Sequence, residues 1–99
     1  MNVQIQAVHF DADRKLIERI EKKVEKFKTF HDKIINVEVT LILEHVNEKI
    51  NDKVVHIKVN IPRTSLFAKH ESKVFEESFE NAFDSIVAQI KKHKEKAVA

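Results

Sequence analysis

Two stretches in the middle of the chain alternate between apolar and polar residues, and this alternation constrains the fold more than any other feature. Between positions 34 and 46 the apolar residues stand mainly at odd positions: Ile35, Val37, Val39, Leu41 and Leu43. The alternation resumes between positions 54 and 61, where the polar residues are His56, Lys58 and Asn60. A period of two residues is the pattern of a β-strand with one buried face. Because the connector at 47–52 is polar, the two runs predict a β-hairpin.

Two shorter stretches repeat this pattern. Positions 3–7 alternate apolar residues with glutamines, which predicts a half-buried strand. Pro62 ends the strand at 54–61, because proline has no N–H to donate. A fourth strand is expected at 65–70, with Phe67 and Lys69 on the face opposite to its apolar residues. The sequence therefore predicts a sheet that buries only one of its faces.

Helical periodicity marks two further segments. Over 12–29, apolar residues recur at spacings of three and four, and Asp11 is expected to cap the N-terminus of this helix. A second helix of about six turns is expected over 75–96. Its apolar stripe consists of Phe75, Phe79, Ala82, Phe83, Ile86, Ile90 and His93.

The expected element order is β-α-β-β-β-α, which is an α+β fold. Since the strands leave one face of the four-stranded sheet polar, both helices are expected to pack on the other face. A length of 99 residues and a hydrophobic content of 42% suit one domain, residues 1–99, with a modest core.

The composition excludes several classes of site. The chain has no cysteine, which excludes thiolate nucleophiles and zinc–sulfur sites, and no glycine, which excludes the Gly-rich loops that hold phosphates. None of the 6 histidines belongs to a metal-binding spacing. No apolar run approaches the ~20 residues of a membrane span. We therefore expect a cytoplasmic protein that is not an enzyme and holds no cofactor or metal.

Charged residues make up 34% of the chain, with a formal net charge of only +2, but they are unevenly distributed. Acidic residues fall on one flank of the first helix, and on the other flank lie Lys15, Arg19, Lys22 and Lys26, with Lys23 at the edge of the apolar stripe. The last helix ends in a second basic group: Lys91, Lys92, Lys94 and Lys96. Helices lying side by side would join both groups into one surface, which Arg63, Lys69 and His70 would extend. Phosphate backbones are the natural ligands of such a surface.

Each part of this surface also has a plainer interpretation. Lysines at a helix C-terminus interact favourably with the helix dipole and are usually solvated. An acidic protein, such as a transcription factor, would also suit the basic helices, so a protein-interaction module is the alternative function. Phe67 is able to stack on a base, although such a residue is more often a packing residue. Glu76, Glu77 and Glu80 are interpreted as charges favoured near a helix N-terminus rather than as catalytic carboxylates.

Three segments together resemble a known family. They are the opening 2–10 (NVQIQAVHF), the segment 61–68 (IPRTSLFA) and the closing 89–94 (QIKKHK). With the length and the element order, they resemble the ribosome hibernation promoting factors. These are ribosome-associated translation inhibitors, once called sigma-54 modulation proteins. The resemblance covers essentially the whole chain.

The resemblance implies a function that spacing alone does not. Members of this family bind the small ribosomal subunit between head and body, where they cover the mRNA path and the A- and P-site tRNA positions. The expected partners are therefore the 30S subunit, the 70S ribosome and 16S rRNA. The implied fold is similar to a double-stranded-RNA-binding domain, which recognises shape and backbone rather than sequence. The chain resembles the short type, without a C-terminal dimerisation domain, and is expected to be monomeric when free.

The resemblance also implies site residues. By position, the basic helix residues of the family correspond to Lys22, Lys23, Lys26, Lys91, Lys92 and Lys94, and its loop and strand-end residues to Arg63 and Lys69. Two features depart from the family pattern. Thr64 stands where glycine is common, which should change only the turn. The last helix begins Val74-Phe75-Glu76 instead of Asp-Met-Tyr, so no contact of that Asp or Tyr is carried over to this chain.

Overall fold

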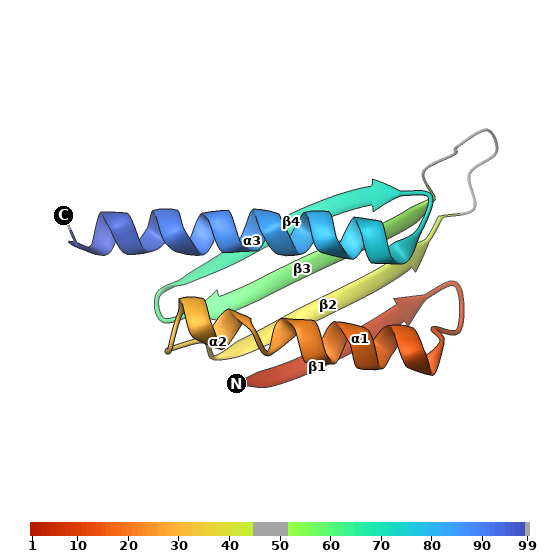
Figure 1. Cartoon of the computed structure of the whole chain (residues 1–99), viewed down its shortest axis with the longest axis horizontal. Helices are drawn as coiled ribbons and strands as arrows, with labels where there is room; N and C mark the ends of the chain where they lie inside the picture. Colours follow the sequence, from red (N-terminus) through yellow and green to blue (C-terminus); the bar gives the residue numbers. More distant parts are fainter. Residues whose placement is uncertain (45–51, 99) are drawn as a thin grey trace.

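The structure is a computed structural model that describes residues 1–44 and 52–98, and the side chains of residues up to 95. The predicted order β-α-β-β-β-α is confirmed, with the first helix divided in two (Figure 1). The elements are β1 (Asn2–Val8), α1 (Arg14–Val24), α2 (Phe27–Phe30), β2 (Asn36–Leu43), β3 (Lys53–Ile61), β4 (Thr64–Ser72) and α3 (Phe75–Val98). Most of the predicted connector at 47–52, and the end of the strand expected over 34–46, lie outside the described residues.

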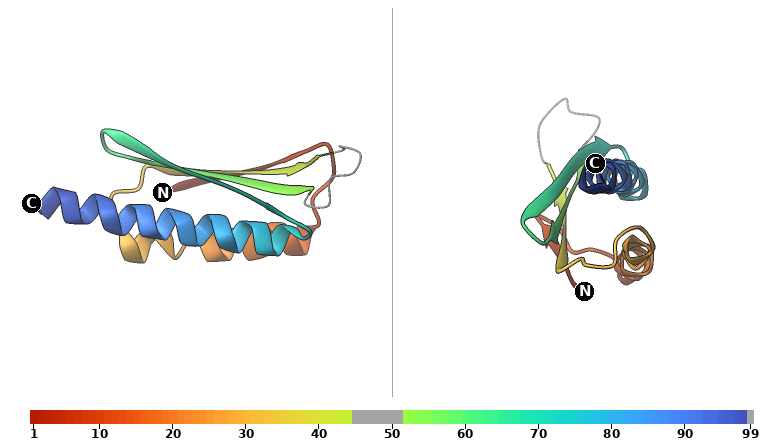
Figure 2. Two further views of the ribbon diagram at one scale, coloured as in Figure 1. Left: turned by 90° about the horizontal axis from the view of Figure 1, so that it is seen from above. Right: turned by 90° about the vertical axis from the view of Figure 1, so that its left-hand side faces the viewer.

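The strands form one sheet in the order β1-β2-β3-β4. β1 and β2 are parallel, whereas β2–β3 and β3–β4 are antiparallel, with Val39 level with Ile5 on one side and Ile57 on the other. The parallel pair requires the long α1–α2 crossover, and the antiparallel pairs are hairpins. The described helices α1, α2 and α3 lie on one face of the sheet, as the right-hand view of Figure 2 shows. The predicted four-stranded α+β sheet with one bare face is therefore confirmed.

The core fills the space between the sheet and the helices. The inward side chains of the central strands, such as Val39 and Ile57, are 0% exposed, because apolar surface is removed from water on both sides. The apolar residues of the α3 stripe are all buried, and the rings of Phe27 and Phe83 stack with centroids 4.5 Å apart. Ile35 is an exception, since it precedes β2 and is 57% exposed, while its neighbour Ile34 is buried.

The start and the continuity of the first helix differ from the prediction. Its N-cap is Asp13, whose carboxylate accepts from the Lys15 N–H at 3.4 Å, and Asp11 is an exposed residue of the connection. The strand ends at Val8, so the chain uses the residues between to cross from the sheet to the helix layer. The helix is also interrupted after Val24, where the Lys26 N–H donates to the carbonyl of Lys23, three residues back.

The helices run in the same direction, and this places the basic residues next to one another. The residue numbers of successive contacts rise along both helical segments. Lys23 contacts Glu80, Phe27 contacts Phe83, and Lys91 lies above the ring of Phe30. α3 packs on β3 and β4, and α1 packs on β1. The last turns of α3 project beyond the sheet in Figure 1. The two helices therefore lie side by side, which is the condition under which the sequence suggested one joint surface.

Candidate nucleic-acid interface

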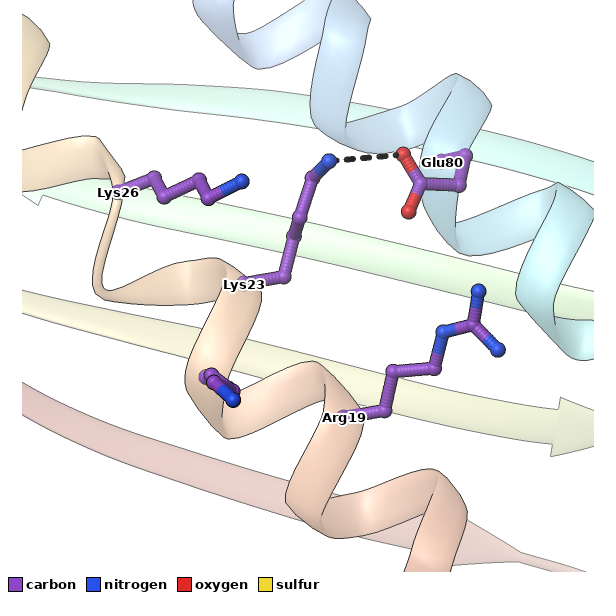
Figure 3. A pocket seen from close by; sticks show the side chains of 5 residues that line it. Arg19, Lys23, Lys26 and Glu80 are labelled. Carbon is purple, nitrogen blue, oxygen red and sulfur yellow. Dashed lines mark ion pairs between the residues drawn. The ribbon is translucent and has the colours of Figure 1, made fainter.

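A shallow groove of about 250 Å³ lies between α1 and α3, and it is predominantly basic. Its lining consists of Arg19, Lys22, Lys23, Lys26 and Glu80. Figure 3 shows Arg19, Lys23 and Lys26 extending from the α1 side toward the groove, with Glu80 opposite them on α3. The residues that sequence periodicity assigned to one flank of the first helix therefore share one surface. The single carboxylate of the lining lowers the positive charge of the groove without cancelling it.

Lys23 is held by the fold itself. Its ammonium nitrogen lies 3.3 Å from a carboxylate oxygen of Glu80 and 5.1 Å from the centroid of the Phe83 ring. Its side chain is only 29% exposed, because the aliphatic part is covered by the helix pair. Lys23 thus connects α1 to α3, whereas Arg19, Lys22 and Lys26 are exposed. Sequence reasoning assigned Glu80 to the helix dipole and missed this pair, although the place of Lys23 at the edge of the apolar stripe was a signal for it.

The lysines of α3 lie toward its C-terminus, and Lys91 is the one that an α2 contact places on the side of the first helix. The ammonium nitrogen of Lys91 lies 5.7 Å from the ring centroid of Phe30, a cation–π contact that fixes α2 against α3. Lys92 lies on the other side of α3, where it lines a second hollow with Leu66, Gln89 and His93. Both lysines are exposed, as is Lys94. Lys96 belongs to α3, but its side chain is outside the described part of the chain.

Two histidines lie beside the α3 lysines. The rings of His31, at the end of α2, and His93 are 6.1 Å apart between centroids. The Nδ1 atom of His31 accepts a hydrogen bond from the Lys33 N–H at 3.0 Å. Burial lowers the pKa of His31, with Lys94 and His93 adding to the effect and Asp32 opposing it. His31 is therefore predominantly neutral at neutral pH.

The remaining predicted residues lie at different distances from the groove and on different faces of the molecule. Lys15 lies exposed on the first turn of α1, in line with the groove. Arg63 occupies the β3–β4 turn with φ 73°, at the end of the sheet beyond which α3 projects (Figure 1). His70 faces the helix side of β4 and is half-buried. Lys69 stands inside β4 on the bare face, beside His56, so the structure does not bring it together with the helix lysines.

The described residues contain no feature of a metal centre or a membrane span. Nowhere within 1–44 and 52–95 do three or more side chains of the metal-ligating types gather at one point. Among the described helices, α3 included, none combines the length and the apolar character needed to cross a bilayer. The geometry of the site is that of a surface for binding, built from exposed cations on two adjacent helices.

A family comparison matches nearly the whole chain. The model of the family described as "Sigma 54 modulation protein / S30EA ribosomal protein" matches residues 3–98. The chain belongs to this family. It is a family of ribosome-associated hibernation factors rather than of enzymes, and the resemblance noted in the sequence is thereby confirmed.

Individual relatives agree with this assignment. The ribosome hibernation promoting factor of Pseudomonas putida is 28% identical over 96 residues, which cover 97% of this chain and 89% of the relative. The ribosome hibernation promotion factor of Bacillus subtilis is 30% identical over 100 residues, and the match covers 97% of this chain but only 50% of that protein. The chain thus corresponds to about half of the longer relative.

Solved structures show the same fold. A ribosomal subunit interface protein from Coxiella burnetii superposes with a TM-score of 0.83 at 23% identity, covering 95% of this chain and 98% of that one. The N-terminal domain of Protein Y from Thermus thermophilus gives a TM-score of 0.78 at 18% identity, covering 94% and 99%. At these identities the likeness supports the fold, and the role of each basic residue rests on its own position.

Proposed function

We propose that the protein binds the small ribosomal subunit along 16S rRNA, in the channel that holds mRNA and the A- and P-site tRNAs. There it inhibits translation by cytoplasmic ribosomes that are idle in stationary phase or stress. One observation supports this most strongly: in a chain of this family, α1 and α3 lie side by side, and exposed cations of α1 line the groove between them. Residues 1–99 act in this proposal as one ribosome-binding domain, monomeric when free.

The physical basis of binding is the neutralisation of phosphates. The exposed cations of the helix layer are Lys15, Arg19, Lys22, Lys26, Lys91, Lys92 and Lys94. Each cation that contacts a phosphate releases a condensed counterion, so affinity falls steeply as salt rises. Six to ten such contacts would weaken binding by about 10³–10⁵ between about 50 and 200 mM salt. Such contacts fix the position of the protein on RNA without reading its sequence.

Inhibition follows from volume rather than from chemistry. The molecule is elongated, with extents of 47 × 25 × 19 Å, and its helix layer forms one long side. A body of this shape bound in the channel occupies the space that mRNA and tRNA need. The bound protein and the translating complex therefore exclude each other, and no catalytic group is required.

Competition tests this proposal. Purified 30S subunits are incubated with the protein alone, or after loading with mRNA and a P-site tRNA, and the bound protein is measured after sedimentation. We expect binding to empty subunits and its loss from loaded ones, together with reduced synthesis in a purified translation system. Equal binding to empty and loaded subunits would place the site outside the channel.

A nuclease treatment separates RNA binding from the protein-interaction alternative. If the basic surface recognises an acidic protein, complexes captured from a lysate survive complete digestion of RNA. If it recognises rRNA phosphates, digestion releases the protein. Retention after digestion would therefore contradict the proposed role of rRNA.

A further inference from the structure

The sheet has one edge that nothing in the described structure covers. β1 pairs only with β2, and the Asn2 N–H donates to the carbonyl of Ile35 at 3.3 Å. Because the N–H and C=O of one residue point to the same side of a strand, even-numbered residues of β1 face β2. The backbone groups of Val3, Ile5 and Ala7 therefore face outward. Within the described residues, no hydrogen bond to these groups is found.

The opposite edge of the sheet, at β4, is protected against pairing with another strand. At β4 the side-chain amide of Gln89 donates to the carbonyl of Phe67 at 2.8 Å, and the strand carries Lys69 and Glu71. Charged residues and covering side chains are the usual means by which proteins block pairing at an edge strand. β1 has the sequence NVQIQAV, without a charge or a proline, and lacks these means. An extended segment is therefore able to add to β1 without meeting a charge on the strand.

The charge beside this edge is negative. Successive helix residues are about 100° apart, so Glu21 lies about 200° round α1 from Lys23. Lys23 points to α3, and by this spacing Glu21 points away from α3. The ribbon of β1 lies at the end of the sheet on that side of α1 (Figure 2, right). Glu18 and Glu25 lie within about 60° of Glu21 on the same flank.

Two of these carboxylates form exposed ion pairs, which a cation of a ligand can replace. Glu18 pairs with Arg14 at 3.0 Å, with side chains 62% and 90% exposed, and Glu25 pairs with Lys28 at 3.0 Å. Exposed pairs of this kind contribute little to stability and reorganise readily around a new cation. The flank thus carries three carboxylates against the two cations Arg14 and Lys28, and its net charge is negative.

We propose that the β1 edge is a docking site for an extended segment of another protein that carries lysine or arginine at alternate positions. The segment adds as a fifth strand, with its backbone paired to Val3, Ile5 and Ala7 and its cations directed toward Glu18, Glu21 and Glu25. A second copy of this chain is a poorer occupant. Antiparallel pairing about Ile5 would place the Glu21 flanks of the two copies opposite each other, and like charges repel.

The probe for this site is a blocked peptide of alternating lysine and threonine, added to the ¹⁵N-labelled full chain. On binding, the amide protons of Val3, Ile5 and Ala7 should exchange with solvent more than about tenfold more slowly, because they become hydrogen-bonded. A peptide of alternating glutamate and threonine should not bind. A lysine–threonine peptide N-methylated on the residues that face β1 should bind more than about tenfold more weakly, since it lacks the donors.

Matched variants test the contribution of charge. Glu21→Gln should lower the affinity for the lysine–threonine peptide several-fold. Glu77 is an exposed carboxylate of α3, and Glu77→Gln should leave this affinity unchanged. Lys22→Gln/Lys26→Gln should also leave it unchanged, because these residues lie on the opposite flank of α1. Peptide docking and ribosome binding are therefore able to fail independently.

Three results would overturn the proposal. Equal binding of the N-methylated peptide would mean that strand pairing is not involved. Chemical-shift changes confined to α1, without slower amide hydrogen exchange at Val3, Ile5 and Ala7, would indicate that the peptide binds only by charge. A dimer seen by sedimentation without peptide, with the same three amides protected, would assign the edge to a second copy of the chain.

Discussion

The ammonium nitrogen of Lys23 lies 3.3 Å from a carboxylate oxygen of Glu80, across the groove between α1 and α3. The pair joins two helices that are far apart in the sequence, and it places a negative charge inside an otherwise basic surface. Glu80 therefore links the two helices and lowers the positive charge of the surface that is proposed to bind phosphate. These two effects are separable by experiment.

Glu80→Gln should strengthen ribosome binding at low salt and lower the free energy of unfolding by less than about 1 kcal/mol, because the carboxylate is partly exposed and the ion pair is screened by solvent. The variant removes the carboxylate and releases Lys23 to contact phosphate. Affinity for 30S subunits and urea unfolding measure the two effects. Glu77→Gln is the matched control, since it changes the net charge equally from an exposed site away from the groove lining. Equal gains in both variants would assign the effect to net charge alone.

Lys22→Gln/Lys26→Gln should weaken 30S binding and reduce the slope of log affinity against log salt by about 2, if each lysine contacts one phosphate. Both side chains are exposed, so unfolding by urea should hardly change. Lys58→Gln/Lys73→Gln removes the same charge from exposed lysines outside the helix surface, and should leave the slope close to that of the unaltered protein. Identical slopes for the two double variants would contradict the placement of the site.

Much of the fold could be predicted because alternation and helical periodicity report directly on burial. Val39, Ile57 and the α3 stripe followed their patterns, and so did the face of β4 that carries Phe67. Two details could not be predicted. Asp11 and Asp13 are equally good caps by residue type, and in the structure the cap is Asp13. The interruption after Val24 occurs among glutamate and lysine, which favour helix, so local propensity carried no signal for it.

Sequence spacing could predict the site residues that share a face of one helix, but not the contacts between two helices. The segregation of charge on α1 follows from the sequence, because it depends on spacing within one element. The involvement of Lys23 with Glu80 depends on how two helices pack, and no spacing shows it. Lys69 was grouped with the helix residues as a strand end, although the alternation already put it on the face opposite to the apolar residues. β4 continues to Ser72, so Lys69 lies inside the strand.

Phe83→Ala should lower the free energy of unfolding by roughly 3–5 kcal/mol, because it removes a buried ring stacked on Phe27 and leaves a cavity. Phe67→Ala is the matched control. Its ring is 52% exposed and touches His56 only edge-on, so a loss below about 1 kcal/mol is expected. Urea unfolding of both variants measures the difference. Similar losses would mean that the bare face of the sheet is not bare in solution.

Stability should fall as the pH is lowered from about 8 to about 5, in part through His31 and His56. Burial lowers the pKa of both; Lys69 adds to the effect at His56, and Glu44 opposes it. In the unfolded chain these histidines bind protons near the ordinary histidine pKa of 6.5, whereas in the folded chain they bind protons only at lower pH. Their stabilising contribution is therefore complete above that value and is lost as the pH falls through the folded pKa.

The variant His31→Gln/His56→Gln should lose less stability over the same interval, because glutamine does not titrate. Urea unfolding at the two pH values measures this difference. A variant whose stability falls as steeply as that of the unaltered protein would assign the pH dependence to other groups.

The most direct test of the proposed function is co-sedimentation of the purified protein with 30S subunits and 70S ribosomes on sucrose gradients, at about 50 and 200 mM salt. We expect nearly stoichiometric protein in the ribosomal fractions at the lower salt and a large loss at the higher salt. Protein that stays at the top of every gradient, or binding that does not respond to salt, would contradict a phosphate-binding surface on α1 and α3.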